Sequence, residues 1–169
     1  MASRLLKPSE VDLARKIFED KVPYNKVHLA SYFLPGNDGV PVTLASVSSL
    51  IPVHSMRSYT IYFGPDVFRD GADQPGPRDT FIHELTHVWQ GYHSGLGWEY
   101  MVESMIAQGH AVITEGNRNR AYDYKTGEPW DSYNVEQQAL LVQDWFRNGM
   151  RTDDERYTYI VNNIRAGKN

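Results

Sequence analysis

The stretch FIHELTHVWQ, residues 81–90, determines how the rest of the chain is interpreted. Its apolar residues recur at the spacing that gives a helix one broad buried face. They are Phe81, Ile82, Leu85, Val88 and Trp89. We therefore predict a largely buried helix from Asp79 onward.

The same stretch contains two histidines and a glutamate in the pattern HExxH. His83 and His87 are four residues apart, so a helix places both imidazoles on one face, where two nitrogens can bind one ion. Glu84 can take a proton from a metal-bound water that attacks a carbonyl and pass it to the leaving amine. Three such groups are costly on a buried helix unless something satisfies them. Zinc suits histidine and carboxylate ligands in an open site, so the stretch predicts a zinc (Zn2+) hydrolase, in the first place a peptidase.

A third protein ligand is expected, and spacing alone leaves two candidates. Glu136 begins the amphipathic segment NVEQQALLVQDWF, where a glutamate could equally serve only the helix dipole. His93 stands at the third-ligand offset of the metzincin motif, but Gln90 occupies the position of the glycine that turns the chain out of the helix. Glu99 and Glu103 are weaker candidates, because they share a helical stripe that solvent can cover.

Other residues are candidates for roles around the ion. The run Tyr59–Phe63 would be an edge strand that binds an extended peptide, or else an ordinary half-buried strand. Its members are Tyr59, Thr60, Ile61, Tyr62 and Phe63. A side chain is also expected to stabilise the tetrahedral intermediate, although a core or structural role suits each candidate at least as well. The candidates are Tyr122, Tyr124, Tyr133 and His110.

The composition limits the class of protein. A chain of 169 residues with 41% hydrophobic and 22% charged residues fits one globular domain over 1–169. The net charge of −4 gives no basic footprint for nucleic acid, and no apolar stretch is long enough to span a bilayer. Because there is no cysteine, a metal must be bound by histidine and carboxylate. The N-terminal segment has no apolar run typical of a signal peptide, so we expect a protein made in the cytoplasm.

Strand signals come early in the chain and helix signals come late. Alternating or β-branched runs predict strands over 26–32, 42–47 and 59–63. Helical spacing predicts helices over 9–19 with Ser9 as N-cap, from 79 to an interruption by Gly91, Gly95 and Gly97, over 98–108, from 134 to Gly149, and over 153–165. This order predicts a single α+β, zincin-like domain with a small N-terminal sheet and a helical C-terminal half that carries the HExxH helix.

With these residues assembled, the chain resembles a bacterial zincin family linked to type VI secretion. Its members include Vgr-related and Rhs-associated metallopeptidases and C-terminal extensions of the secretion spike protein. The matching segments are LKPSEVDLARKIFEDKVPYNKVHL, FIHELTHVWQ, AYDY at 121–124 and NVEQQALLVQDWF, which together extend over most of the chain. FIHELTHVWQ is the most specific of these matches. The resemblance implies a zinc site formed by His83, His87 and the glutamate of EQQA, Glu136, which places Glu136 ahead of His93.

The resemblance also implies an antibacterial effector delivered by type VI secretion to the periplasm of a target bacterium. A secretion spike or adaptor and an immunity protein are then the expected partners. The substrate would be a protein or the peptide stems of peptidoglycan, and the sequence does not separate the two. A second hypothesis is a binding or adaptor module that keeps a zincin fold without turnover. Glu84 argues against it, because zinc binding alone does not need that residue.

Overall fold

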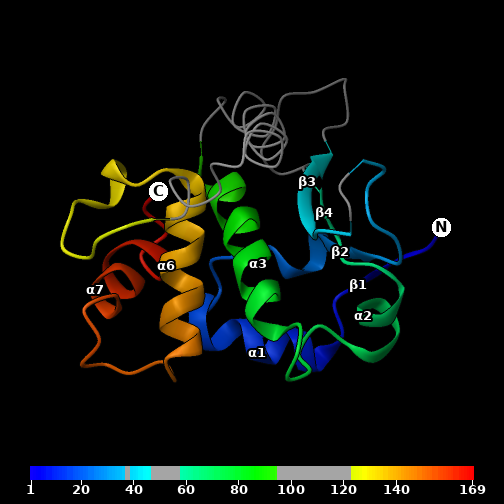
Figure 1. Cartoon of the computed structure of the whole chain (residues 1–169), viewed down its shortest axis with the longest axis horizontal. Coiled ribbons are helices and arrows are strands. Elements are labelled where there is room, and N and C mark those ends of the chain that lie inside the picture. The colour runs from blue at the N-terminus through cyan, green and yellow to red at the C-terminus, as the bar shows by residue number, and fades with distance from the viewer. Residues whose placement is uncertain (37–38, 47–57, 95–122) are drawn as a thin grey trace.

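The computed structural model describes residues 1–36, 39–46, 58–94 and 123–169. Over these residues the fold is mixed α+β, with a small sheet near the N-terminus and helices through the C-terminal half (Figure 1). This confirms the predicted α+β class, with a small N-terminal sheet and a helical C-terminal half. Within the described ranges, none of the helices is both long and apolar enough to cross a membrane.

The sheet has four strands in the order β1-β2-β4-β3. They are β1 (Ser3–Leu5), β2 (Val27–Ala30), β3 (Val42–Ser46) and β4 (Ser58–Tyr62). The pairs β1–β2 and β3–β4 are antiparallel, whereas β2 and β4 are parallel. Thr43 of β3 and Leu29 of β2 both pair with Ile61, so these three side chains share the inner face of the sheet.

The prediction that Tyr59–Phe63 forms an edge strand is wrong. β4 has β2 on one side and β3 on the other, so both of its edges are already hydrogen bonded. Its alternating burial, with Tyr59 and Ile61 inside, is typical of a strand that covers a core on one face. Within the described residues, the edges of the sheet belong to β1 and β3.

Seven helical segments accompany the sheet in the described part of the chain. They are α1 (Pro8–Phe18), a 3-10 turn (Tyr24–Lys26), α2 (Pro65–Asp70), α3 (Arg78–His93), a second 3-10 turn (Trp130–Ser132), α6 (Val135–Arg147), and α7 (Tyr157–Tyr159) running into a π-helical turn (Ile160–Ile164). α3 lies in the middle, packed against β3 on one side and α6 on the other (Figure 1). The sequence did not predict β1 or α2, and the predicted helix over 98–108 lies outside the described residues.

Three predicted helix boundaries differ from the structure. α1 begins at Pro8, not after Ser9, because the Glu10 carboxylate accepts a hydrogen bond from the Lys7 N–H at 2.6 Å and closes the first turn there. Gly91 does not end α3, which continues to His93. The last helix begins only at Tyr157, because Asp154 accepts hydrogen bonds from the backbone and guanidinium of Arg156 and holds a turn.

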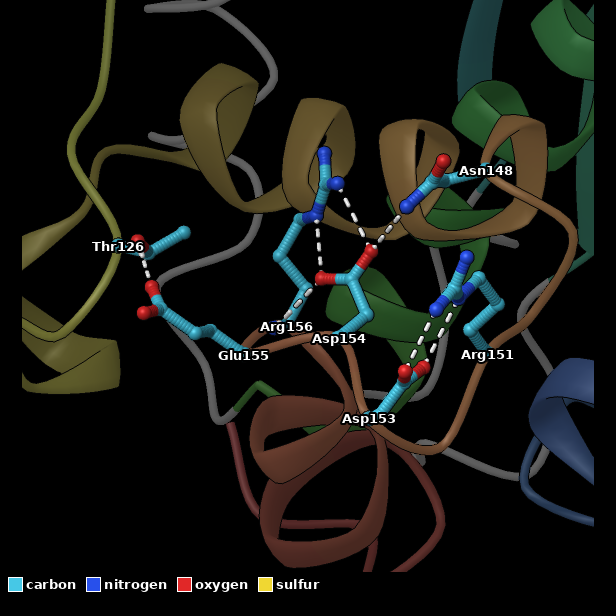
Figure 2. A pocket seen from close by; sticks show the side chains of 7 residues that line it. All are labelled: Thr126, Asn148, Arg151, Asp153, Asp154, Glu155 and Arg156. Carbon is cyan, nitrogen blue, oxygen red and sulfur yellow. Dashed lines mark hydrogen bonds and ion pairs between the residues drawn. The ribbon is translucent and has the colours of Figure 1, made fainter.

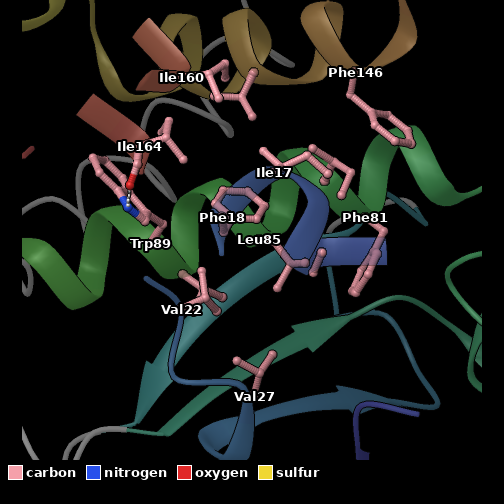
Figure 3. Packing of buried hydrophobic residues seen from close by; sticks show 14 of the residues in the cluster. Ile17, Phe18, Val22, Val27, Phe81, Leu85, Trp89, Phe146, Ile160 and Ile164 are labelled. Atoms are coloured by element: carbon pink, nitrogen blue, oxygen red, sulfur yellow. Dashed lines mark hydrogen bonds between the residues drawn. The ribbon is translucent and has the colours of Figure 1, made fainter. Parts of the chain in front are cut away.

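The core fills the space between the sheet, α1 and the central helix. Figure 3 shows Phe81, Leu85 and Trp89 of α3 meeting Ile17 and Phe18 of α1, all of them buried. The apolar stripe predicted for residues 81–89 is therefore the face that attaches α3 to the rest of the molecule. The Trp89 indole N–H donates to the Ile164 carbonyl at 3.0 Å, which also fixes the C-terminal turn onto α3.

Glu10 is a fully buried carboxylate that connects the N-terminal elements. It accepts two hydrogen bonds of 2.8 Å from the Arg4 guanidinium and one of 2.8 Å from the Ala72 N–H, in addition to the one from Lys7. Burial alone would raise the pKa of Glu10, but these donors outweigh it and lower that pKa below its usual range. The ion pair with Arg4 and the hydrogen bond from Ala72 thereby join β1, α1 and the segment after α2.

Candidate metal centre

Three side chains from two helices converge beside the centre of α3. His83 Nε2 lies 3.2 Å from His87 Nε2 and 3.2 Å from a Glu136 oxygen, and His87 Nε2 lies 3.5 Å from the other oxygen of Glu136. One donor atom from each of the three lies within 4.8 Å of the others, so all three can contact a single ion. As predicted from their four-residue spacing, His83 and His87 lie on one face of the helix.

Glu136 owes its position to the way α6 begins. The Asn134 side chain accepts a hydrogen bond from the Gln137 N–H at 2.9 Å, and the Gln137 side chain accepts one from the Asn134 N–H at 3.0 Å. This reciprocal capping box starts the helix at Val135 and places Glu136 in its first turn. α6 lies along α3, so this first turn faces the histidines (Figure 1).

Both imidazoles are held from behind by glutamine side chains. His87 Nδ1 lies 2.8 Å from Gln90 Oε1, and His83 Nδ1 lies 3.1 Å from Gln143 Oε1. A carboxamide oxygen only accepts, so each Nδ1 carries a proton and each Nε2 is the ring nitrogen that faces the cluster. A metal bound at Nε2 requires this Nδ1–H arrangement, with the proton lost from Nε2.

Gln90 also ties the two helices together. It is fully buried, and its amide nitrogen donates to the Val135 carbonyl at 2.9 Å and to Gln138 Oε1 at 2.8 Å. Gln138 in turn donates to the Trp130 carbonyl at 3.1 Å. One side chain therefore orients His87 and fixes the first turn of α6, which carries Glu136.

The charges of the cluster depend on one another. Burial by itself lowers the pKa of His87, but the Glu136 carboxylate and, more weakly, Glu84 outweigh it and raise that pKa to about 9. Burial raises the pKa of Glu136, but the two histidines outweigh it and bring the pKa well below its usual range. Without a metal, His87 and Glu136 therefore form a cation–anion pair at neutral pH, and a metal has to replace the proton.

Glu84 lies on the side of α3 that faces the sheet. Its side chain is almost completely buried, and its Oε2 accepts a hydrogen bond of 2.7 Å from the hydroxyl of Thr43 on β3. The carboxylate lies close enough to His87 to contribute to that residue's raised pKa. The candidate base is thus adjacent to the cluster but bound to a different element, the edge strand.

The alternative third ligand, His93, does not lie in the cluster. Because α3 continues through Gly91, His93 stays on the helix and points to another face, where its Nε2 lies 2.8 Å from the Lys21 carbonyl. Its ring contacts Trp89 and Tyr92. The metzincin arrangement needs the chain to leave the helix before this position, and Gln90, in the place of the expected glycine, continues it.

Two of the predicted stabilising tyrosines have other partners. The Tyr124 hydroxyl donates to Asp144 at 2.7 Å, and the Tyr133 hydroxyl donates to the Lys125 carbonyl and lies 3.2 Å from the Tyr159 hydroxyl. Neither hydroxyl is hydrogen bonded to His83, His87 or Glu136, so these contacts favour the structural role over the catalytic one. The remaining candidates fall outside the described residues; they are Tyr122, His110, Glu99 and Glu103.

A separate open pocket of about 330 Å³ lies at the C-terminal end of α6 (Figure 2). Its charged side chains pair with one another: Arg151 with Asp153 at 2.6 Å and Arg156 with Asp154 at 2.8 Å, while Glu155 accepts from Thr126. None of the lining residues belongs to the His83–His87–Glu136 cluster. These internal pairs leave the pocket without an unpaired arginine to attract a ligand.

Comparison with known proteins connects this fold to a secretion system. No protein-family model matches the chain. The chain is 25% identical, over 98% of its length, to the type VI secretion system spike protein VgrG2b of Pseudomonas aeruginosa, and spans 15% of that protein. The solved effector domain of Pseudomonas aeruginosa VgrG2b matches the structure with a TM-score of 0.60 and 28% identity, over 94% of this chain and 82% of that one.

This homology links the chain to type VI secretion. The predicted link to that system is therefore confirmed. The predicted zinc ligands and the predicted peptidase activity stay predictions, because neither name mentions a metal or a reaction.

Proposed function

We propose that this chain is a zinc-dependent peptidase domain that acts as a type VI secretion effector. The observation that carries the proposal is the convergence of His83, His87 and Glu136 beside the candidate base Glu84. Homology to the effector domain of VgrG2b supports the effector role.

The chemistry of the donor set fits zinc. Two imidazole nitrogens and one carboxylate oxygen are the ligands of many open catalytic zinc sites, whereas magnesium and calcium prefer oxygen ligands. The glutamines behind the two imidazoles supply the orientation that such ligands need. A bound zinc ion would supply a Lewis acid that polarises a carbonyl and makes a water molecule more acidic.

The protein groups supply proton transfer and binding. Glu84 would accept the proton of the attacking water and deliver it to the nitrogen of the leaving amine, so that one carboxylate serves as base and then as acid. β3 pairs with β4 along one edge, and the opposite edge has no strand partner within the described residues. An extended peptide would add to this edge by β-augmentation, which moves the proposed binding strand from β4 to β3.

The proposed delivery by type VI secretion indicates the class of substrate. An effector delivered to the periplasm of a target bacterium would meet proteins and the peptide stems of peptidoglycan, and both offer an extended amide backbone. We expect the secretion spike or an adaptor as the delivery partner and an immunity protein in the producing cell.

The decisive experiment compares wild type with Glu84→Gln, which removes the base but keeps the shape of the side chain. Zinc content of the purified proteins would be measured together with hydrolysis of a quenched fluorescent peptide library. Growth would be followed after expression in a bacterial host, with and without an added signal peptide. The exposed Glu128→Gln serves as the control for loss of a glutamate charge.

We expect about one zinc per chain in all three proteins. Wild type and Glu128→Gln should hydrolyse peptide and should inhibit growth of the host when a signal peptide directs them to the periplasm. Glu84→Gln should do neither. Equal toxicity of Glu84→Gln would instead identify a binding module without turnover. A wild type that binds no zinc and gains no activity when zinc is added would refute the peptidase.

A further inference from the structure

Thr43 is a polar residue on the inner, otherwise apolar face of the sheet. It is only 2% exposed and lies in register with Ile61, whose side chain is in the core. Its hydroxyl lies 2.7 Å from Glu84 Oε2 and 3.2 Å from the Glu84 backbone carbonyl. A valine at this position would bury more apolar surface than threonine does. The hydroxyl of Thr43, and its contact with Glu84, therefore requires an explanation.

The hydroxyl has one proton, and the geometry shows where it goes. The Glu84 carbonyl lies inside α3, where the helical N–H ladder already supplies a donor. The carboxylate oxygen is both closer and charged, and hydrogen bonds to charged acceptors are shorter and stronger. Thr43 therefore donates to Oε2, and no other hydrogen bond to this carboxylate is found within the described residues.

We propose that Thr43 is a positioning residue for Glu84, an inference that rests on the proposed peptidase function. A glutamate side chain has three rotatable bonds, and a bond to Oε2 selects one arrangement and leaves Oε1 to handle the proton. Proton transfer requires the base to lie within hydrogen-bond distance of the attacking water. Fixing the Glu84 side chain in one conformation should therefore increase the rate of the reaction.

The position of Thr43 gives the contact a second consequence. Thr43 belongs to β3, whose outer edge is the one that would pair with an extended peptide. The same strand then sets the position of the substrate backbone and the position of the base. A peptide that pairs with β3 in register is thereby aligned with Glu84, whereas one bound elsewhere is not.

The test compares Thr43→Val, which keeps the shape but removes the hydroxyl, with Thr43→Ser, which keeps the hydroxyl. Thr86→Val is the matched control, because Thr86 is also a completely buried threonine but donates within its own helix, to the Ile82 carbonyl. Each protein would be analysed for zinc content, for kcat and KM on the best peptide of the fluorescent library, and by crystallography.

For Thr43→Val we expect a fall in kcat of roughly 10-fold or more, the loss typical of a hydrogen bond to a charged group. KM and zinc content should stay unchanged. The crystal structure should show the Glu84 carboxylate displaced, and Thr43→Ser should restore its place and most of the rate. Thr86→Val should behave as wild type.

A Glu84 carboxylate that keeps its place in Thr43→Val, or a rise in KM with kcat unchanged, would overturn the positioning role. Failure of the peptidase proposal gives a different result. In that case wild type itself hydrolyses no peptide with zinc supplied, while the crystallographic displacement in Thr43→Val still decides whether Thr43 holds Glu84.

Discussion

Replacing Gln90 with leucine would remove the side chain that joins the two ligand-bearing helices. Leucine has a similar volume and suits the buried environment, so the change acts mainly through hydrogen bonds. Gln90 accepts from His87 Nδ1 and donates to Gln138 Oε1 and to the Val135 carbonyl. The Val135 carbonyl keeps its helical partner in α6, whereas the other two groups lose theirs.

The expected cost follows from these two orphaned groups. A buried polar group without a partner costs about 1–3 kcal/mol, so with two such groups the metal-free variant should lose about 2–6 kcal/mol of unfolding free energy. For a chain of this size that corresponds to a fall in Tm of about 6–17 °C. Loss of the group behind a ligand histidine should also weaken zinc binding about 10- to 100-fold.

Thermal unfolding in chelator measures the first effect, and competition with a fluorescent zinc chelator measures the second. Gln143→Leu separates the two, because Gln143 is half-buried and holds only His83. That variant should weaken zinc binding with a much smaller loss of stability. If Gln90→Leu unfolds at the wild-type temperature and binds zinc as tightly as wild type, the inferred role of the carboxamide is refuted.

Two further predictions concern the cluster itself. Glu136→Gln should lose most of the zinc measured by mass spectrometry while His93→Ala keeps it, and the opposite pattern would favour the metzincin arrangement. The raised pKa of His87 stabilises the metal-free fold fully below its ordinary value of 6.5, and this contribution is lost as pH rises through about 9. Urea denaturation in chelator should therefore show stability falling across this range, more steeply than in Glu136→Gln; equal slopes would contradict it.

Local patterns in the sequence predicted the central parts of the fold. The apolar stripe of residues 81–89 identified α3 and its buried face, and Asn134 identified the start of α6. The β-branched and aromatic runs identified three of the four strands, within one or two residues at most ends. Such patterns succeed because helix faces, caps and strand alternation are properties of neighbouring residues.

Strand order and helix crossings are not local properties, and the sequence did not predict them. Nothing within Tyr59–Phe63 shows that β2 and β3 pair with its two edges, so its edge position was a wrong prediction. In the sequence, Gln90 is only a departure from the metzincin motif, in which glycine is expected. Its partners on α6 lie 45 and 48 residues away, so its role becomes visible only in the structure. Thr43 is likewise an ordinary β-branched strand residue until the sheet is placed against α3.

The two halves of the cluster are attached to the molecule unequally. His83 and His87 are on α3, which is enclosed by β3, α1 and α6, whereas Glu136 is in the first turn of α6, next to its capping box. Helix ends open more often than helix centres. A bound ion would therefore leave when that first turn frays, and the rate at which a chelator takes up the ion would report how often the start of α6 opens.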